Sequence, residues 1–488
     1  MENLRVASPA GRWVLAATVL GSAIASIDAT VVGIALPAIG RDLDAGLSAL
    51  QWVVTAYTLT LAGLLLVAGD LGDRYGRRRM FLAGVVWFVV ASMGCAFAPS
   101  GPVLVGARAL QGVGAALLTP GSLAILEASF APQDRSRAIG AWSGLSGVAT
   151  AAGPFLGGWL VEAWSWRLIF LINLPLAAVV IILTWRHVPE SRDPQVSGRV
   201  DVVGGALVTL GLVGLTYGLI EGPGAGWTEP VVAGALGAGV LLLLAFVAWE
   251  RRVTVPMLPL ELFAARQFAA TNLVTFAVYA ALGGALFLLP LQLQQVCGYS
   301  ALQSGAALLP VTVLMLALSS RSGALAARIG PRAQMSFGPL LVGAGLALLA
   351  RIDAAGGYLT EVFPAVVVFG LGLAATVAPL TATALGAVPA RHAGIASAVN
   401  NDVARAATLI AVAVLPAAGG ITGATYLDPA AFSQGFHTAV LIAAGVCAIG
   451  GTIAASTIRN PPRPAWSTGP PRRSGAVHCC LDGPPLAE

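Results

Sequence analysis

The chain has 488 residues, of which 57% are hydrophobic and only 10% are charged, with a net charge of +5 at pH 7. Soluble domains carry roughly a quarter charged residues, so this composition excludes a soluble protein and indicates helices that face lipid or one another. All 27 basic residues are arginine, and without lysine the chain has neither a phosphate-binding P-loop for ATP nor a Schiff-base nucleophile.

Apolar stretches that are long enough to cross a bilayer follow one another along the chain. A helix needs about 20 apolar residues to span the hydrocarbon core, and the strict alternation of a transmembrane β-strand is absent. We therefore predict an all-α polytopic membrane protein with fourteen transmembrane helices. The predicted spans are 14–38, 51–69, 80–98, 102–123, 138–160, 167–185, 202–220, 229–249, 267–291, 302–325, 334–350, 358–384, 393–417 and 436–457.

A glycine- and arginine-rich turn occurs twice, as GDLGDRYGRRR at 69–79 and as GALAARIGPR at 323–332. Both copies follow the second span of a set of six, which predicts two pseudo-repeated six-helix halves, 1–186 and 266–457. Residues 187–265 then hold a linker and an inserted helix pair, and 458–488 form a tail that we expect to be disordered and cytoplasmic. Duplicated helical units with a shared midplane site are typical of secondary transporters.

The arginines indicate the orientation of the chain. With a cytoplasmic N-terminus, only Arg41, Arg167 and Arg351 fall on outer loops, and Arg108 and Arg405 fall within spans. The remaining arginines lie on the inner side, which agrees with the positive-inside rule. Both termini are therefore predicted to be cytoplasmic.

Two charged residues lie inside apolar spans of the first half, Asp28 in the first span and Arg108 in the fourth. Each is costly alone in a membrane, and such residues usually mark ion or substrate pathways. We expect them to face each other. Burial disfavours the charged form of Asp28 and the arginine favours it, as a reversible proton carrier requires. The alternative is a static buried ion pair.

The first turn carries Gly69, Asp73, Arg74, Gly76 and Arg77. The glycines permit a tight turn and close helix approach, and the aspartate can cap a helix end or pair with an arginine. We predict a conformational latch at the cytoplasmic ends of the two halves. The alternative is an arginine cluster that only sets topology. The second copy has alanine in place of the aspartate.

The fifth span contains Gly153, Pro154, Gly157 and Gly158. The proline removes a backbone hydrogen bond and the glycines form a small-residue face for tight helix contact. We predict a bend and a sealed seam.

The thirteenth span contains Asp402 and Arg405, which lie three residues apart and so share one helical face. Asp402 is a second candidate for protonation. The alternative is that it only neutralises Arg405.

These segments resemble motifs of the major facilitator superfamily, in particular its fourteen-span branch of drug:proton antiporters. The resemblance rests on IDATVVGIALP (27–37), the turn at 69–79, LVGARALQGVGAA (104–116), the Gly-Pro segment 144–159 and WRLIFLINLP (166–175). It implies a proton-coupled exporter of hydrophobic drugs or antibiotic-like secondary metabolites, which works by alternating access in a bacterial cell membrane. The Gly153-Pro154 segment resembles the motif associated with exporters.

Aromatic and amide side chains within the spans are the candidates for binding a small hydrophobic substrate. They are Trp52, Tyr57, Gln111, Asn272, Tyr279 and Gln294. Because few acids lie deep in the spans, we expect a neutral or singly charged compound rather than a dication.

Two other functions compete with export. A proton-coupled importer of a small organic solute would use the same fold. An intramembrane enzyme or sensor would need a catalytic or metal site at membrane depth, and none of the four histidines lies there. We therefore expect no enzyme activity, no cofactor, no metal and no nucleic acid or ATP as partners. The expected partners are lipid, protons and substrate, and the chain is expected to act as a monomer.

Overall fold

The computed structural model describes residues 4–192, 200–254, 256–354, 356–389 and 393–460. Most of these residues lie in helices, and the one β pairing among them is an isolated bridge between Leu4 and Phe130. Fourteen helical segments in this part of the chain are long and apolar enough to cross a membrane, which confirms the predicted number.

The helices follow the predicted order. The first half contains α1 (Pro9–Asp42), α2 (Leu47–Tyr75), α3 (Arg77–Ala96), α4 (Gly101–Ser129), α5 (Pro132–Ala163), α6 (Leu168–Leu171) and α7 (Asn173–His187). The inserted pair is α8 (Val202–Ala225) and α9 (Pro230–Glu250), followed by the short turn η1 (Leu260–Ala264). The second half contains α10 (Arg266–Leu291), η2 (Gln292–Val296), α11 (Ala301–Ala307), α12 (Leu309–Ile329), α13 (Pro331–Leu349), η3 (Tyr358–Val362), α14 (Phe363–Gly386), α15 (Ala393–Ala418), α16 (Gly423–Tyr426) and α17 (Pro429–Thr457).

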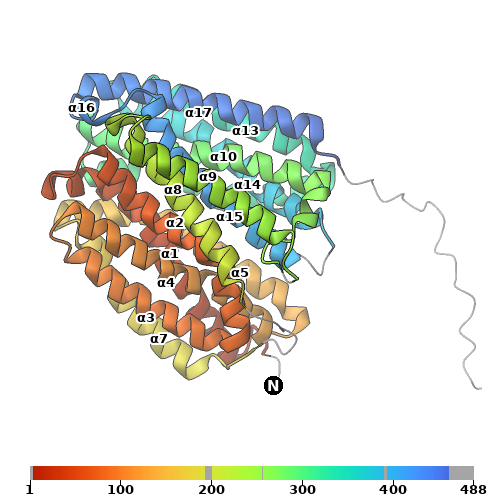
Figure 1. Cartoon of the computed structure of the whole chain (residues 1–488). Helices are drawn as coiled ribbons and strands as arrows, with labels where there is room; N and C mark the ends of the chain where they lie inside the picture. Colours follow the sequence, from red (N-terminus) through yellow and green to blue (C-terminus); the bar gives the residue numbers. More distant parts are fainter. Residues whose placement is uncertain (1–3, 193–199, 255, 355, 390–392, 461–488) are drawn as a thin grey trace, which may run out of the picture.

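The same helix pairs pack in both halves (Figure 1). In the first half α1 packs on α5 and α7, and α4 packs on α2 and α3. In the second half α10 packs on α15 and α17, and α14 packs on α12 and α13. A duplicated unit produces this repetition. The inserted α8 contacts α2 of one half and α15 of the other, and α9 packs on α8.

The turn predicted over 69–79 is shorter in the structure than in the sequence prediction. Helix α2 continues through Gly69 and Asp73 to Tyr75, and the chain reverses at Gly76, whose φ is 115°. The i, i+4 ion pair Asp70–Arg74 supports this extra helical length, and the ion pair Asp73–Arg77 joins the end of α2 to the start of α3 across the turn. A φ this positive is readily adopted by glycine alone.

The second copy of the motif has the same geometry. Helix α12 ends at Ile329, and Gly330 has a φ of 90°. Two residues after each glycine, a backbone N–H donates to the side chain of a residue that lies just beyond the last helix of the same half. Arg78 N–H donates to Glu190 at 3.1 Å, and Arg332 N–H donates to Asn460 at 3.0 Å.

Some helix ends differ from the prediction. Helix α17 begins at Pro429 rather than near 436, because the Asp428 carboxylate caps it by accepting from Ala430 N–H and Ala431 N–H. Helix α5 begins at Pro132, six residues before the predicted start of the fifth span at 138. The tail predicted over 458–488 lies outside the described residues from 461 onward.

Candidate functional site

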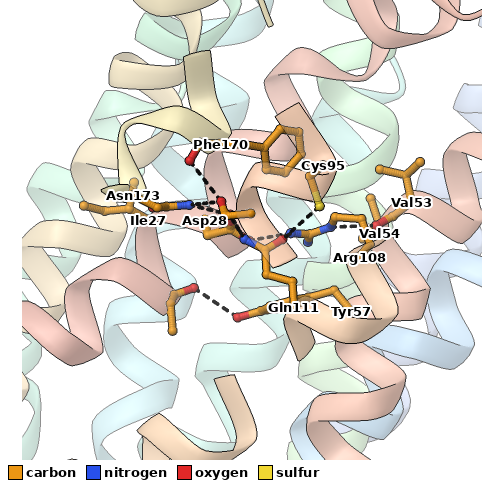
Figure 2. Close-up of polar contacts among 12 residues, drawn as sticks. Ile27, Asp28, Val53, Val54, Tyr57, Cys95, Arg108, Gln111, Phe170 and Asn173 are labelled. Atoms are coloured by element: carbon orange, nitrogen blue, oxygen red, sulfur yellow. Dashed lines mark hydrogen bonds and ion pairs between the residues drawn. The ribbon is translucent and has the colours of Figure 1, made fainter. Parts of the chain in front are cut away.

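A buried ion pair lies at the centre of the first half (Figure 2). Asp28 of α1 and Arg108 of α4 are 0% and 1% exposed, and Arg108 Nη1 lies 2.5 Å from Asp28 Oδ2. The other carboxylate oxygen accepts from Gln111 Nε2 at 2.8 Å and from Asn173 Nδ2 at 3.1 Å. Each charge therefore has the partners that make burial in a membrane tolerable.

Arg108 is held on several sides. Its Nε donates to the Val53 carbonyl at 3.1 Å, and its Nη1 also donates to Gln111 Oε1 at 2.7 Å. The guanidinium lies 4.3 Å from the ring centre of Tyr57, a distance at which a cation is attracted to an aromatic face.

The structure adds two residues that the sequence prediction did not assign to the site, Ser92 of α3 and Asn173 of α7. The Ser92 hydroxyl donates to the Phe170 carbonyl at 2.9 Å and accepts from Gln111 and Asn173. Four helices, α1, α3, α4 and α7, thus meet in one hydrogen-bond network around Asp28.

A cavity of about 480 Å³ lies between the two halves. Helices α1, α2, α4 and α5 line it on one side, and α10 and α15 line it on the other. Its polar lining includes Tyr57, Arg108, Trp142, Tyr279 and Arg405, and no described Asp or Glu is among the lining residues. Arg108 reaches the cavity, whereas Asp28 does not.

Only two of the six predicted substrate-binding residues, Tyr57 and Tyr279, line this cavity. The other four point elsewhere because they lie on other faces of their helices. The Trp52 indole donates to Glu221 of α8, Gln111 belongs to the Asp28 network, Asn272 accepts from Asn400, and Gln294 donates to the Ile34 carbonyl.

Asp402 and Arg405 do not form an ion pair in the described part of the chain. Asp402 Oδ1 and Arg405 Nε are both buried without a hydrogen-bond partner there. Arg405 lines the cavity, and Asp402 lies one turn away without lining it.

The two halves are joined at the end that carries Asp42, which we call the Asp42 end. There Gln51 of α2 donates to the Val412 carbonyl of α15 at 2.7 Å, and Glu162 of α5 accepts from Ser300 and from Leu302 N–H. One apolar core includes residues of both halves at this end.

At the opposite end, which we call the Gly76 end, the apolar cores of the two halves are separate. The first-half core contains Val14, Phe81 and Phe130, and a smaller one in the second half contains Phe268 and Ala396. Among the described residues, buried apolar side chains therefore join the two halves at the Asp42 end and do not join the first-half core to the second half at the Gly76 end.

The sequence profile of the Major Facilitator Superfamily matches residues 18–411, which is most of the chain. The chain belongs to this superfamily. It is therefore a membrane transporter protein rather than an enzyme, as predicted.

Relatives with assigned names agree with this membership. The chain is 37% identical over 402 residues to the multidrug resistance protein Stp of Mycobacterium tuberculosis (strain CDC 1551 / Oshkosh), a match that covers 82% of this chain and 74% of that protein. It is 36% identical over 473 residues to the puromycin resistance protein pur8 of Streptomyces alboniger, which covers 94% and 93%.

A solved structure has the same fold. A bacterial homologue of the human lysosomal transporter Spinster, in an inward-facing and unoccupied conformation, superposes with a TM-score of 0.67. The match covers 92% of this chain and 97% of that one at 17% sequence identity, so it bears on the fold alone.

The segment that resembles the exporter motif of the superfamily packs against both halves. A Cβ at Gly153 would collide with Thr30 of α1, and one at Gly157 would collide with Val31 of α1. A Cβ at Gly158 would instead overlap the backbone of α11, 2.8 Å from Leu302 Cα. Pro154 lines the cavity. Its carbonyl oxygen packs against Gly305 of α11, where a Cβ would collide with it.

The residues predicted as a superfamily latch bind within the first half in this conformation. Asp73 pairs with Arg77 at 2.7 Å, and Arg77 Nη1 also donates to the Ala124 carbonyl of α4. A Cβ added to Gly69 would lie 3.8 Å from Pro120 Cβ of α4. Arg74 pairs with Asp70. The hydrogen bonds and ion pairs of Asp73 and Arg77 among the described residues lie within the first half, and the latch stays a prediction.

Proposed function

We propose that this protein is a proton-coupled exporter of hydrophobic drugs or antibiotic-like metabolites that works by alternating access. The observation that carries the proposal is a cavity of about 480 Å³ between two repeated halves, beside the buried Asp28–Arg108 pair. The similarity to proteins named for multidrug and puromycin resistance supports the substrate class.

The proposed orientation in the membrane follows from the arginine bias. We place the protein in a bacterial cell membrane with both termini and the Gly76 end in the cytoplasm, where most arginines lie. The halves then separate on the cytoplasmic side and pack together on the outer side. This is the conformation that would take up a compound from the cytoplasm or inner leaflet.

In the proposed cycle, the ionised Asp28 belongs to the inward-facing, substrate-loading state. After the halves rock and release the compound outside, a proton binds Asp28. Protonation removes the charge that Arg108, Gln111 and Asn173 now stabilise, so the contacts between α1, α4 and α7 can rearrange for the return step. One proton that moves inward down 100 mV supplies about 2.3 kcal/mol.

The proposed functional unit is one chain, because both halves and both walls of the cavity come from it. We propose that Asp402 is a second proton site, secondary to Asp28, because Asp28 is hydrogen-bonded to two other helices whereas Asp402 Oδ1 has no hydrogen-bond partner in the described part of the chain. The latch of Asp73 and Arg77 would engage the second half when the cytoplasmic side closes.

The test uses everted membrane vesicles with an acidic interior, in which hydrophobic antibiotics and cationic dyes are added outside. With wild-type protein we expect some compounds to accumulate inside and to dissipate the pH gradient. Asp28→Asn should abolish both effects, because the amide cannot exchange a proton. Asp44→Asn, which removes an exposed aspartate on the loop after α1, is the matched control and should behave like wild type.

Equal responses of wild type and Asp28→Asn would show that Asp28 is structural. If preloaded solute left the vesicles together with protons, the protein would be an importer instead, because an importer carries both in the same direction.

A further inference from the structure

The cavity contains two arginines in very different surroundings. Arg108 is paired with Asp28 and also bonds to Gln111 and the Val53 carbonyl. Within the described residues, Arg405 has neither an ion pair nor a hydrogen bond, and its Nε is buried without a partner. A guanidinium in a membrane interior is costly unless an anion or hydrogen-bond acceptors compensate it.

The surroundings of Arg405 contain groups that suit an anion. Tyr279 of α10 lines the same cavity as Arg405, and its hydroxyl has no hydrogen-bond partner among the described residues. Asn401, one turn before Arg405, also lines the cavity. No described carboxylate lines the cavity to compete for the arginine.

The rest of the lining determines what else the ligand carries. Apolar side chains from both halves line the same cavity as the Arg405 guanidinium. They include Val32, Val54, Leu282, Leu286 and Phe287. A guanidinium offers planar, paired donors that match a carboxylate in geometry. The lining therefore combines an apolar wall with one free cation.

We propose that Arg405 is the specificity-determining residue of the cavity and binds the ionised acidic group, a carboxylate or acidic enolate, of an otherwise hydrophobic substrate. This inference rests on the proposed function as an exporter and names its substrate class. Asp402 lies three residues earlier on α15 without pairing with Arg405, and when it is ionised it weakens the field of Arg405.

The test measures binding rather than transport, so its outcome is separate from that of the vesicle experiment. Purified protein in phosphatidylcholine nanodiscs, which contain no anionic lipid, is titrated calorimetrically with 9-anthracenecarboxylate and with its neutral isostere, 9-anthracenecarboxamide. Wild type should bind the acid roughly tenfold or more tightly than the amide, as expected for a charge-assisted contact.

Two substitutions should shift this preference in opposite directions. Arg405→Gln should lower affinity for the acid roughly tenfold or more and leave the amide nearly unchanged. Asp402→Asn should raise affinity for the acid alone. Arg321→Gln removes an exposed arginine of α12 that does not line the cavity and is the matched control, which should bind both compounds like wild type.

Each result decides the proposal. The proposal is overturned if wild type binds acid and amide equally, or if the preference for the acid survives Arg405→Gln. It is also overturned if millimolar chloride fully displaces the acid, because the site would then be one for small inorganic anions. If acid binding depends on Arg405 but vesicles show no proton-linked transport, the exporter proposal fails and the binding site stands. If transport is proton-linked but binding ignores Arg405, the reverse holds.

Discussion

At the residue scale, the side chains around Asp28 explain how one proton can act on several helices. The carboxylate accepts from Arg108 and Gln111 of α4 and from Asn173 of α7, so its charge ties α1 to two neighbours. A protonated carboxyl has lost that charge and presents an O–H donor, which the guanidinium of Arg108 cannot accept because it has no acceptor atom. Protonation of the Asp28 carboxylate therefore changes the contacts between α1 and its neighbouring helices.

Asn173 allows the network to be tested separately from proton binding. Asn173→Leu removes donors to Asp28 and Ser92 and leaves both less satisfied, which should lower the free energy of unfolding by about 1–3 kcal/mol. A lower Tm in a detergent thermal-denaturation assay checks this. Asn401→Leu is the control, because its amide donates only to Ser397 on its own helix. A similar fall in Tm for both variants would contradict a special role of the network.

The sequence predicts the charged part of this site and misses the uncharged part, for a physical reason. Asp28 and Arg108 are conspicuous because an unpaired charge is rare in an apolar span. Ser92 and Asn173 are uncharged, and such residues are tolerated at many places in a span. Whether Trp52 faces the cavity or α8 depends on the position of the inserted helices, which the repeat does not specify.

At the element scale, helix α5 contacts both halves at the Asp42 end, and in the proposed cycle it acts as the hinge between them. Gly157 and Gly158 are consecutive and therefore point about 100° apart around the helix. This lets α5 pack on α1 of its own half and on α11 of the other half at the same level. The seam predicted from sequence thus has two sides, and in the proposed cycle only the side at Gly158 opens.

Gly158→Val should open the seam without disturbing the first half. Its side chain would overlap the Ala301 and Leu302 backbone, so α5 and α11 must separate and the closed Asp42 end loses stability. Pulsed electron paramagnetic resonance between labels on α5 and α11 should give longer distances, and export should fall roughly tenfold or more. Gly147→Val on the same helix meets no atom within 4 Å and is the control. Unchanged distances in Gly158→Val would refute the hinge.

At the scale of the whole molecule, the length of the apolar stretches is enough to predict the number of spans, because a membrane imposes the length of each helix. The lengths of the ends were less predictable. The Asp70–Arg74 ion pair supports α2 beyond the predicted span to Tyr75, and α17 starts early because of the Asp428 cap. Which end of the bundle is closed depends on contacts such as Gln51 to Val412, which join residues far apart in sequence.

The net charge moved in each cycle follows from combining the two sites. If one proton enters at Asp28 while a neutral compound leaves, one charge crosses the membrane. If the compound is an anion held by Arg405, two charges cross, and 100 mV then supplies about 4.6 kcal/mol instead of about 2.3 kcal/mol. In proteoliposomes with a fixed pH gradient and a potassium diffusion potential, we expect the logarithm of the accumulation ratio of 9-anthracenecarboxylate to rise about twice as steeply with voltage as that of its amide. Equal slopes would mean that the acid crosses the membrane in its neutral, protonated form. Arg405 would then have no substrate carboxylate to bind during transport.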